Sequence, residues 1–567
     1  MKEKLEISVK KALKTLSIEA ESVSFEHPTE ISHGDYSTNI ALALSKHSKE
    51  NPRVLAEKIV GEINKKLPKE IHKVEVAGAG FINFFLSKEF FVEQTAEILA
   101  EGQNFGRNSS LKKEKVVIEY TNPNPFKQFH IGHLMNNAIG ESLSRIVDAS
   151  GAKLTRVNYQ GDVGLHVAKA LYGMMHSSRP LPKEESLEKQ IAYLGESYVA
   201  GATAYEENEE AKKEIQEINK KVFEKSDKEI NKLYEWGRKI SLEDFERLYQ
   251  KLGTKFEHYF FESEAGAIGK KIVLEYLEKG VFEKSDGAII FPGEKHALHT
   301  RVFINSQGLP TYEAKELGVS QMKYDMYRYD LSLVVAGNEI NDYFKVLTRV
   351  IAILYPELAD KIKHIPNGML RLASGKMSSR KGNVILGNDL ISDVEKLVEE
   401  KMKDRELPAG QKKEIVEKVA IGAIKYSILR QSPGKDIIFD LDKSLSFEGD
   451  SGPYLQYTAV RANSVLEKAK EMKIKSSAKD GEGEVNLVEK MLYRFPEIVE
   501  LSLKEYAPQY IATYLIELAG AFNSYYGNTK IINTDPGVSY RLSLTEAVKI
   551  VLANGLNLLG IQVPEKM

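Results

Sequence analysis

The chain has 567 residues, more than a single hydrophobic core supports, so we expect three or four domains. Hydrophobic residues make up 42% and charged residues 28% of the sequence, which argues against a fibrous repeat and against a largely disordered chain. The net charge of −2 argues against a uniformly basic nucleic-acid coat, and the absence of cysteine excludes disulfides and thiolate zinc sites.

The apolar stretches are short. The longest, such as VVIEY and LSLVVAG, fall well below the roughly 20 residues that a membrane span requires. The amino end, MKEKLEISVKKALKTL, alternates lysines with apolar residues and has no continuous apolar core of a secretory signal. We therefore expect a cytoplasmic protein that does not associate with membranes.

Residues 1–107 are predicted to form a small α+β domain. The pattern is helix, loop, helix, followed by two short strands around VEVAGAG and FINFFL. A polar turn over 101–113 then ends the domain.

Residues 113–390 are predicted to form an α/β domain with a parallel sheet. A strand rich in β-branched residues, Val116–Tyr120, leads through the turn TNPNPFKQF into a helix, and a second strand follows at Leu154–Tyr159. The helix has apolar residues at helical spacing, namely Leu134, Ile139, Leu143 and Ile146. Because ligands bind at the carboxyl ends of parallel strands, we expect the active site near Asn122–His133.

The rest of the chain is predicted to be mostly helical. Residues of about 180–286 are highly charged with a helical period, which indicates a helical insertion; a solvated face without direct chemistry is the alternative interpretation. The runs AIIFPG, RVFINSQG and LSLVVAG are expected to complete the parallel sheet. Residues 391–567 are expected to form an all-α domain.

The first chemical motif is HIGH, at His130, Ile131, Gly132 and His133, in the turn that enters the predicted helix. Two imidazole donors lie beside a glycine that lets a phosphate approach, at a helix amino end that favours anions. The motif therefore predicts a site for ATP phosphates. Paired histidines also bind metals, but no third ligand lies nearby in sequence, so we expect no metal held by protein side chains.

The second motif is the cationic loop GKMSSRKGN. Its small residues and glycines allow it to close on a triphosphate and to neutralise the charge that develops on departing pyrophosphate. By itself such a loop is more often a solvated turn, but its order after HIGH favours a functional role. Its candidate residues are Lys376, Met377, Ser378, Arg380 and Lys381.

HIGH followed by such a loop is typical of class I aminoacyl-tRNA synthetases, and the chain resembles the arginyl-tRNA synthetases over nearly its whole length. Further similar segments are SHGDYSTNIA, GAGFINFFL, PTYEAKELG, GDSGPYLQYTAVRANS and the ending LNLLGIQVPEKM. The resemblance implies a Rossmann-like catalytic domain with a helical insertion, a small domain that binds the tRNA elbow, and a helical anticodon-binding domain.

One position departs from the family pattern. The family loop has a second lysine, which stabilises the transition state of adenylate formation, where this chain has Ser379. Many arginyl enzymes that lack this lysine have one just before HIGH, and Lys127 stands there. We therefore predict that Lys127 supplies the missing charge.

The resemblance also implies the substrate contacts. Arginine would be held by Glu119, Asn124, Tyr312 and Glu316, since a guanidinium requires carboxylates and planar acceptors. Glu316 replaces a frequent aspartate, and VAGNEINDYF (Val335–Phe344) departs from the family, so further contacts cannot be transferred. A surface ion pair is the alternative for Glu119, and a core aromatic for Tyr312.

The implied tRNA contacts lie in the first and last domains, where aromatic and arginine side chains suit unstacked bases. They are Asn83, Tyr454, Gln456, Tyr457 and Arg461. Helix packing is an equally good interpretation of the two tyrosines.

The predicted function is that of an arginine–tRNA ligase acting as a monomer. L-Arginine attacks Mg-ATP to give arginyl-adenylate, and tRNA(Arg) then takes the arginine; the resemblance implies that activation requires tRNA. Two alternatives are a class I synthetase for another amino acid and an inactive tRNA-binding paralogue.

Overall fold

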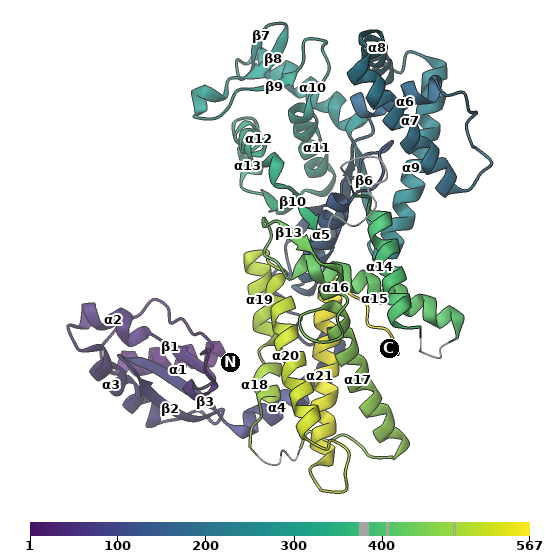
Figure 1. Cartoon of the computed structure of the whole chain (residues 1–567). Coiled ribbons are helices and arrows are strands. Elements are labelled where there is room, and N and C mark those ends of the chain that lie inside the picture. The colour runs from purple at the N-terminus through teal and green to yellow at the C-terminus, as the bar shows by residue number, and fades with distance from the viewer. Residues whose placement is uncertain (374–384, 404–407, 480, 482–483) are drawn as a thin grey trace. The chain divides into compact units, whose positions relative to one another are not determined.

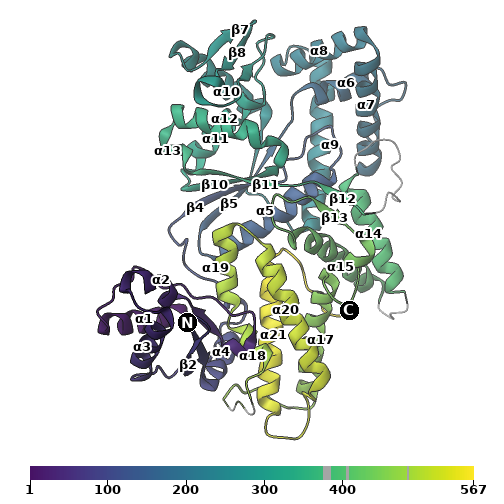
Figure 2. The ribbon, with the colours of Figure 1, turned by 60° about the vertical axis from the view of Figure 1, so that its left-hand side comes forward.

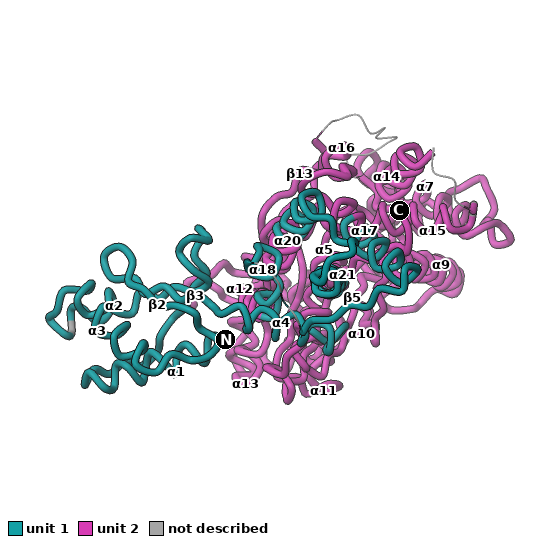
Figure 3. The backbone as a smooth tube through the Cα atoms, turned by 90° about the horizontal axis from the view of Figure 1, so that it is seen from below, with its two compact units in different colours: residues 1–105, 458–496, 517–554 teal, residues 106–457, 497–516, 555–567 magenta. Residues whose placement is uncertain are grey.

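The structure is a computed structural model that describes residues 1–373, 385–403, 408–479, 481 and 484–567 (Figure 1). The chain forms two compact units, coloured separately in Figure 3. Unit 1 comprises residues 1–105, 458–496 and 517–554, and unit 2 comprises residues 106–457, 497–516 and 555–567. No helix among the described residues is long and apolar enough to cross a membrane.

Unit 1 begins with an α+β fold. Its antiparallel sheet has the order β1-β3-β2, with β1 (Tyr36–Thr38), β2 (Ile71–Ala77) and β3 (Phe81–Leu86). The helices are α1 (Lys2–Thr15), α2 (Ile40–Ser48), α3 (Pro52–Asn64) and α4 (Lys88–Glu101). The predicted strand pair is confirmed as β2 and β3, whereas β1 is too short to show an alternating pattern in the sequence.

The carboxyl-terminal part of the chain is helical, as predicted. Its helices are α17 (Gly452–Glu471), α18 (Leu487–Leu492), α19 (Phe495–Glu505), α20 (Gln509–Asn528) and α21 (Val538–Leu558). Within unit 1, Tyr493 after α18 packs its ring against Tyr36 and Phe90, and Lys490 pairs with Asp35 at 3.2 Å. These contacts join segments of unit 1 that lie far apart in the sequence.

Unit 2 is built on a five-stranded parallel sheet of order β11-β10-β4-β5-β6 (Figure 2). The strands are β4 (Lys115–Glu119), β5 (Lys153–Gln160), β6 (His258–Phe261), β10 (Leu331–Gly337) and β11 (Ile362–Asn367). The continuous buried run Val116–Glu119 is typical of a parallel strand covered on both faces. Helix α5 (Ile131–Ala149) packs against β4, β5 and β10.

Two of the three runs expected to complete this sheet do not join it. AIIFPG and RVFINSQG form β8 (Ala288–Phe291) and β9 (Arg301–Ile304), which pair with β7 (Glu283–Ser285) in a separate antiparallel sheet. The reason is the turn between β7 and β8, where Asp286 and Gly287 both have positive φ, at 48° and 78°. An Asp-Gly pair of this kind favours a tight hairpin over a crossover. Only LSLVVAG enters the parallel sheet, as β10.

The helical insertion ends earlier than the predicted residue 286. It consists of α7 (Leu187–Glu207), α8 (Glu209–Glu224) and α9 (Lys228–Leu252), which pack with α6 (Leu165–Met175) around a core of their own. The chain then returns to the parallel sheet in β6, which pairs with β5. Strand β6 has only four residues and follows charged helices, so its hydrophobic pattern is too short to be recognised in the sequence.

The remaining described elements of unit 2 follow the sheet or connect its strands. They are α10 (Glu262–Glu278), α11 (Tyr312–Tyr327), α12 (Asn341–Leu354), α13 (Pro356–Ala359), β12 (Leu370–Leu372), α14 (Gly387–Lys401), α15 (Ala409–Leu429), β13 (Ile437–Phe439) and α16 (Leu441–Ser444). Strand β13 pairs with β12, so it interrupts the region predicted to be entirely helical.

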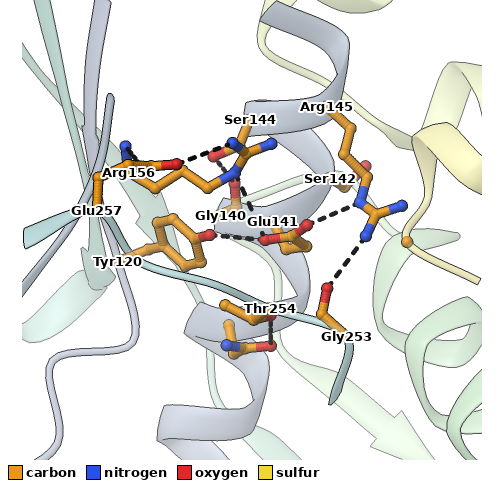
Figure 4. Close-up of polar contacts among 12 residues, drawn as sticks. Tyr120, Gly140, Glu141, Ser142, Ser144, Arg145, Arg156, Gly253, Thr254 and Glu257 are labelled. Atoms are coloured by element: carbon orange, nitrogen blue, oxygen red, sulfur yellow. Dashed lines mark hydrogen bonds and ion pairs between the residues drawn. The ribbon is translucent and has the colours of Figure 1, made fainter. Parts of the chain in front are cut away.

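A buried carboxylate fixes the position of α5 (Figure 4). Glu141 on α5 accepts a hydrogen bond of 2.7 Å from the Tyr120 hydroxyl and pairs with Arg145 at 2.7 Å. Arg145 also donates to the Gly253 carbonyl oxygen at the end of α9. This network ties α5 to the end of β4 and to the end of the insertion.

Glycines allow α10 and α11 to pack at backbone distance. A Cβ atom added at Gly318 on α11 would lie 2.0 Å from the carbonyl oxygen of Ala265 on α10, and one added at Gly269 would lie 1.7 Å from that of Ala314. The two helices therefore have a reciprocal glycine contact, which fixes α11 relative to the sheet.

We predict that Gly318→Ala lowers the free energy of unfolding by about 1–3 kcal/mol, because the backbone of α10 must move. The melting temperature of the purified variant checks this. Gly520→Ala on α20 is the control, since an added Cβ there has no neighbour within 4 Å, and its effect should be neutral or stabilising by up to about 1 kcal/mol. Equal effects of the two substitutions would contradict the packing argument.

Candidate active site

The turn between β4 and α5 has a strained backbone. Thr121, Asn122 and Phe126 have φ of 75°, 49° and 68°, and a β-branched residue at positive φ is a genuine outlier. Each such residue costs about 1–3 kcal/mol, and such strain gathers at functional sites. Buried partners hold the turn: the Thr121 hydroxyl accepts from Asn137, and the Phe126 amide donates to the Ser241 hydroxyl.

The two histidines of HIGH are brought together at the amino end of α5. Their rings stack with centroids 3.6 Å apart. The His130 Nδ1 accepts from the Gly132 amide at 3.1 Å, and the His133 Nδ1 accepts from the His130 amide at 3.3 Å. An imidazole that accepts at Nδ1 carries its proton on Nε2. Each ring is therefore left with an Nε2–H donor for a ligand.

Burial keeps both rings neutral. It lowers the pKa of His130 to about 4, with a smaller contribution from the Lys127 ammonium. Burial also lowers the pKa of His133 well below its ordinary value, and His130 and Lys127 act in the same direction. The pair is thus suited to donate hydrogen bonds to an anion near pH 7 without carrying charge.

The segment that follows the second motif lies against HIGH. The Ile131 amide donates to the Ile385 carbonyl oxygen at 3.1 Å, and the Gly387 amide donates to the Phe129 carbonyl oxygen at 2.8 Å. The residues predicted for the cationic loop lie outside the described residues, and they are Lys376, Met377, Ser378, Ser379, Arg380 and Lys381. The described chain therefore brings the carboxyl side of the second motif to the first.

Lys127 lines a cavity of about 410 Å³ in unit 2. The cavity wall is cationic and aromatic: the Lys127 ammonium lies 5.4 Å from the centroid of the Tyr198 ring, and Lys169 and Lys315 also line it. Burial, and then Lys169, lowers the pKa of Lys127. A lysine that is already partly desolvated interacts strongly with a phosphate that enters.

The carboxylates predicted for arginine gather on β4 and α11. Glu119 is fully buried, and its Oε2 pairs with the Lys323 ammonium at 2.7 Å. Burial, and then the charge of Glu119, raises the pKa of Glu316 to about 8, while Lys323 opposes this shift. The surface ion pair proposed as the alternative for Glu119 is thus wrong, because the pair is buried.

Asn124 and Tyr312 flank this cluster. The Asn124 side chain packs on the backbone of Gly161, where an added Cβ would lie 2.2 Å from its Oδ1 atom. Tyr312 begins α11, is 65% exposed and lines the cavity that contains Lys127. The alternative interpretation of Tyr312 as a core aromatic is therefore wrong.

Two residues expected to contact tRNA are buried. Asn83 is buried on β3, and its Oδ1 accepts from the Ser37 hydroxyl at 2.8 Å. Gln456 is fully buried and donates to the carbonyl oxygens of Lys418 and Gln562. Both amides therefore have internal hydrogen-bond partners, and their contact with tRNA stays a prediction.

The other three expected contacts are half-buried on α17. Tyr457 packs edge-on to Phe447 at 6.4 Å, and Arg461 bonds with Asn523. Tyr454 is also half-buried. Each thus has an internal role as well as a partly accessible surface.

The sequence reading missed several residues of this site. They are Tyr159, Glu262, Lys315, Lys323 and Tyr343. A signal existed for Lys323, which lies seven residues after Glu316 and so on the same helix face. The sequence contains no such signal for Glu262. This residue begins α10, directly after β6, in a region that the sequence pattern assigned to the helical insertion. Among the described residues, no group of three histidine or carboxylate side chains is arranged so that it could hold a metal ion.

We predict that His130→Phe lowers the rate of ATP-dependent activation by about 10²–10³, because one donor to the phosphates is lost. The ratio of wild-type to variant rate should stay constant from pH 6 to pH 8, since a pKa of about 4 leaves the imidazole neutral throughout. Pyrophosphate exchange measured across this range checks it, with the exposed His299→Phe as the control. A ratio that rises towards pH 6 would indicate that a charged imidazole acts instead.

Comparison with known proteins agrees with this geometry. Residues 94–441 match the family model of tRNA synthetases class I (R), catalytic domain, residues 455–567 match the DALR anticodon binding domain, and residues 3–86 match the arginyl tRNA synthetase N terminal domain.

Similar proteins cover almost the entire chain. The arginine–tRNA ligase of Treponema denticola is 32% identical over 96% of this chain and 95% of its own, and that of Pediococcus pentosaceus is 31% identical over 96% and 95%. The structure of Thermus thermophilus arginyl-tRNA synthetase shares the fold, with a TM-score of 0.80, 24% identity and complete coverage of both chains. The chain belongs to the arginyl-tRNA synthetases of class I.

Proposed function

We propose that this chain, an arginine–tRNA ligase, activates L-arginine with ATP at the carboxyl edge of its parallel sheet and transfers it to the 3′ end of tRNA(Arg). The observation that supports this site best is that one connection carries both kinds of group: β4 ends at the buried carboxylate Glu119, whose charge acts on Glu316, and the turn after it leads into the neutral histidine pair at the start of α5. The first group suits a guanidinium, and the second suits a triphosphate.

Arginine is held by the carboxylates of Glu119 and Glu316. Tyr159 adds a hydroxyl that is buried and has no hydrogen-bond partner among the described residues. Its pKa is raised by burial and then by neighbouring carboxylates, Glu262 first, so it stays a neutral phenol. A guanidinium with five N–H donors satisfies such acceptors together. Asn124 and Tyr312 complete the arginine site from its two sides.

ATP is held at the amino end of α5. The Nε2–H groups of His130 and His133 donate to its phosphates, and Gly132 allows close approach of the backbone. An arginine carboxylate oxygen attacks the α-phosphorus, the bond to the β-phosphate bridging oxygen breaks, and pyrophosphate leaves. Lys127 stabilises the charge on the α-phosphate. Residues Lys376, Met377, Ser378, Arg380 and Lys381 of the second motif act on the leaving pyrophosphate.

A terminal ribose hydroxyl of tRNA then attacks the carbonyl carbon, and AMP leaves. Neither step requires a protein nucleophile, so positioning and electrostatics supply the catalysis. The RNA is contacted by Tyr454, Tyr457 and Arg461, and its binding is required for activation.

We propose further that Mg²⁺ enters as the ATP complex and that the protein works in the cytoplasm as a monomer. Residues 1–107 form a domain that binds the tRNA elbow, residues 113–390 form the catalytic domain, and residues 391–567 bind the anticodon.

We predict that Lys127→Met lowers the rate of arginyl-adenylate formation by about 10²–10³, because a partly desolvated charge near the α-phosphate is lost. Single-turnover measurements with tRNA present check the rate, and calorimetry should show arginine affinity nearly unchanged. Lys113→Met, an exposed lysine before β4, is the control. An unchanged rate in Lys127→Met would contradict the role of Lys127.

A further inference from the structure

The arginine pocket has one more acid than base. Three buried or half-buried carboxylates gather at it, Glu119, Glu262 and Glu316. Two lysines from α11 pair with two of them: Lys323 with Glu119, and Lys315 with Glu262 at 2.5 Å. Glu316 has no lysine partner among the described residues. The pocket is therefore short of one positive charge.

The Lys323–Glu119 pair is closed to solvent. Both side chains are only 1% exposed, and the ammonium lies 2.7 Å from Oε2 of the carboxylate. The other oxygen, Oε1, accepts from the Asn122 amide at 2.9 Å, and the Asn122 Oδ1 in turn accepts from the Tyr159 backbone amide. A buried ion pair of this kind contributes little net stability compared with apolar packing, which leaves its purpose open to a functional explanation.

Lys323 also shares a helix face with Glu316, two turns earlier on α11. The same helix thus supplies the unmatched acid and the base that neutralises the acid of β4. Glu119 therefore already has a cation, whereas Glu316 has no ion-pair partner among the described residues.

We infer that Lys323 is a positioning residue of the arginine pocket: by neutralising Glu119 it leaves Glu316 as the single carboxylate whose charge the substrate guanidinium must match. The inference rests on the proposed function, because it assumes that arginine binds at this cluster. Lys323 acts through Glu119 and does not itself touch the substrate.

Arginine binding is also expected to change the protonation of Glu316. The groups that face Glu316 are Glu119 from β4, Lys323 from α11, Glu262 from α10, Tyr343 from α12 and Tyr159 from β5. Burial and the neighbouring carboxylates raise the pKa of Glu316 to about 8, so the free protein holds a proton there at pH 7. A bound guanidinium favours the ionised carboxylate. Arginine binding therefore releases this proton below pH 8, and the release fades above that pH.

Removal of Lys323 changes which acid meets the guanidinium. In Lys323→Met the buried Glu119 loses its cation and, like Glu316, takes up a proton in the free protein. In Lys323→Arg the internal pair is preserved. In Glu316→Gln the unmatched acid is gone while Glu119 keeps its ammonium, and in Glu316→Gln/Lys323→Met the unmatched acid is Glu119 instead of Glu316.

The experiment is titration of the full-length protein with L-arginine by calorimetry at pH 7, in two buffers of different ionisation enthalpy. The expected release is close to one proton per arginine for the wild type, for Lys323→Arg and for Glu316→Gln/Lys323→Met, and close to none, with weaker binding, for Glu316→Gln. Any change in the arginine α-amino group is common to all four proteins. Lys323→Gln, which keeps a neutral donor for Glu119, should behave like Lys323→Met and replaces it if that variant does not fold.

The outcomes separate the two proposals. A double variant Glu316→Gln/Lys323→Met that releases no proton and binds arginine no better than Glu316→Gln would overturn the role of Lys323, even if the wild type binds arginine well. A purely structural role predicts that loss of Lys323 lowers affinity further and does not restore the proton release that Glu316→Gln removes. No heat of arginine binding to the folded wild type would overturn the proposed arginine site itself, and with it this inference.

Discussion

The active site depends on a chain of buried polar contacts that starts at the Lys323–Glu119 ion pair. Glu119 holds the Asn122 amide, and Asn122 holds the backbone of Tyr159 on the neighbouring strand. Between these anchors the backbone passes through positive φ at Thr121 and Asn122. Without buried partners such strain would relax. The strained turn is what places Lys127 and HIGH beside the arginine pocket.

Burial has opposite effects on the titratable groups of α5 and of α11. At the amino end of α5 it lowers the pKa values of His130 and His133, so that the imidazoles are neutral donors. At α11 it raises the pKa of Glu316 to about 8, so that the carboxylate is protonated until a cation arrives. Both effects follow from the cost of charge in a poorly solvated environment. One desolvated edge of the sheet thus suits an anion on one side and a cation on the other.

Sequence reasoning identified the parts of the fold with strong patterns. The strand Val116–Tyr120, the helix after HIGH and the helical carboxyl-terminal region were all predicted and are present. It failed where pairing depends on turn geometry, as at Asp286–Gly287, or where a strand such as β6 is too short for a period.

Only those site residues that lie in a recognisable local motif could be predicted from the sequence. HIGH and Glu316 could be named from local sequence, but the partners of a buried charge are decided by tertiary structure. Lys323 and Glu119 are more than 200 residues apart in the chain, and no local pattern relates them. For the same reason the burial of Asn83 and Gln456 could not be read from the sequence.

The most direct test of the account is ATP–pyrophosphate exchange with each of the 20 amino acids, with and without tRNA. The account predicts exchange with arginine alone and only when tRNA is present. Exchange with another amino acid, or no exchange under either condition, would contradict it.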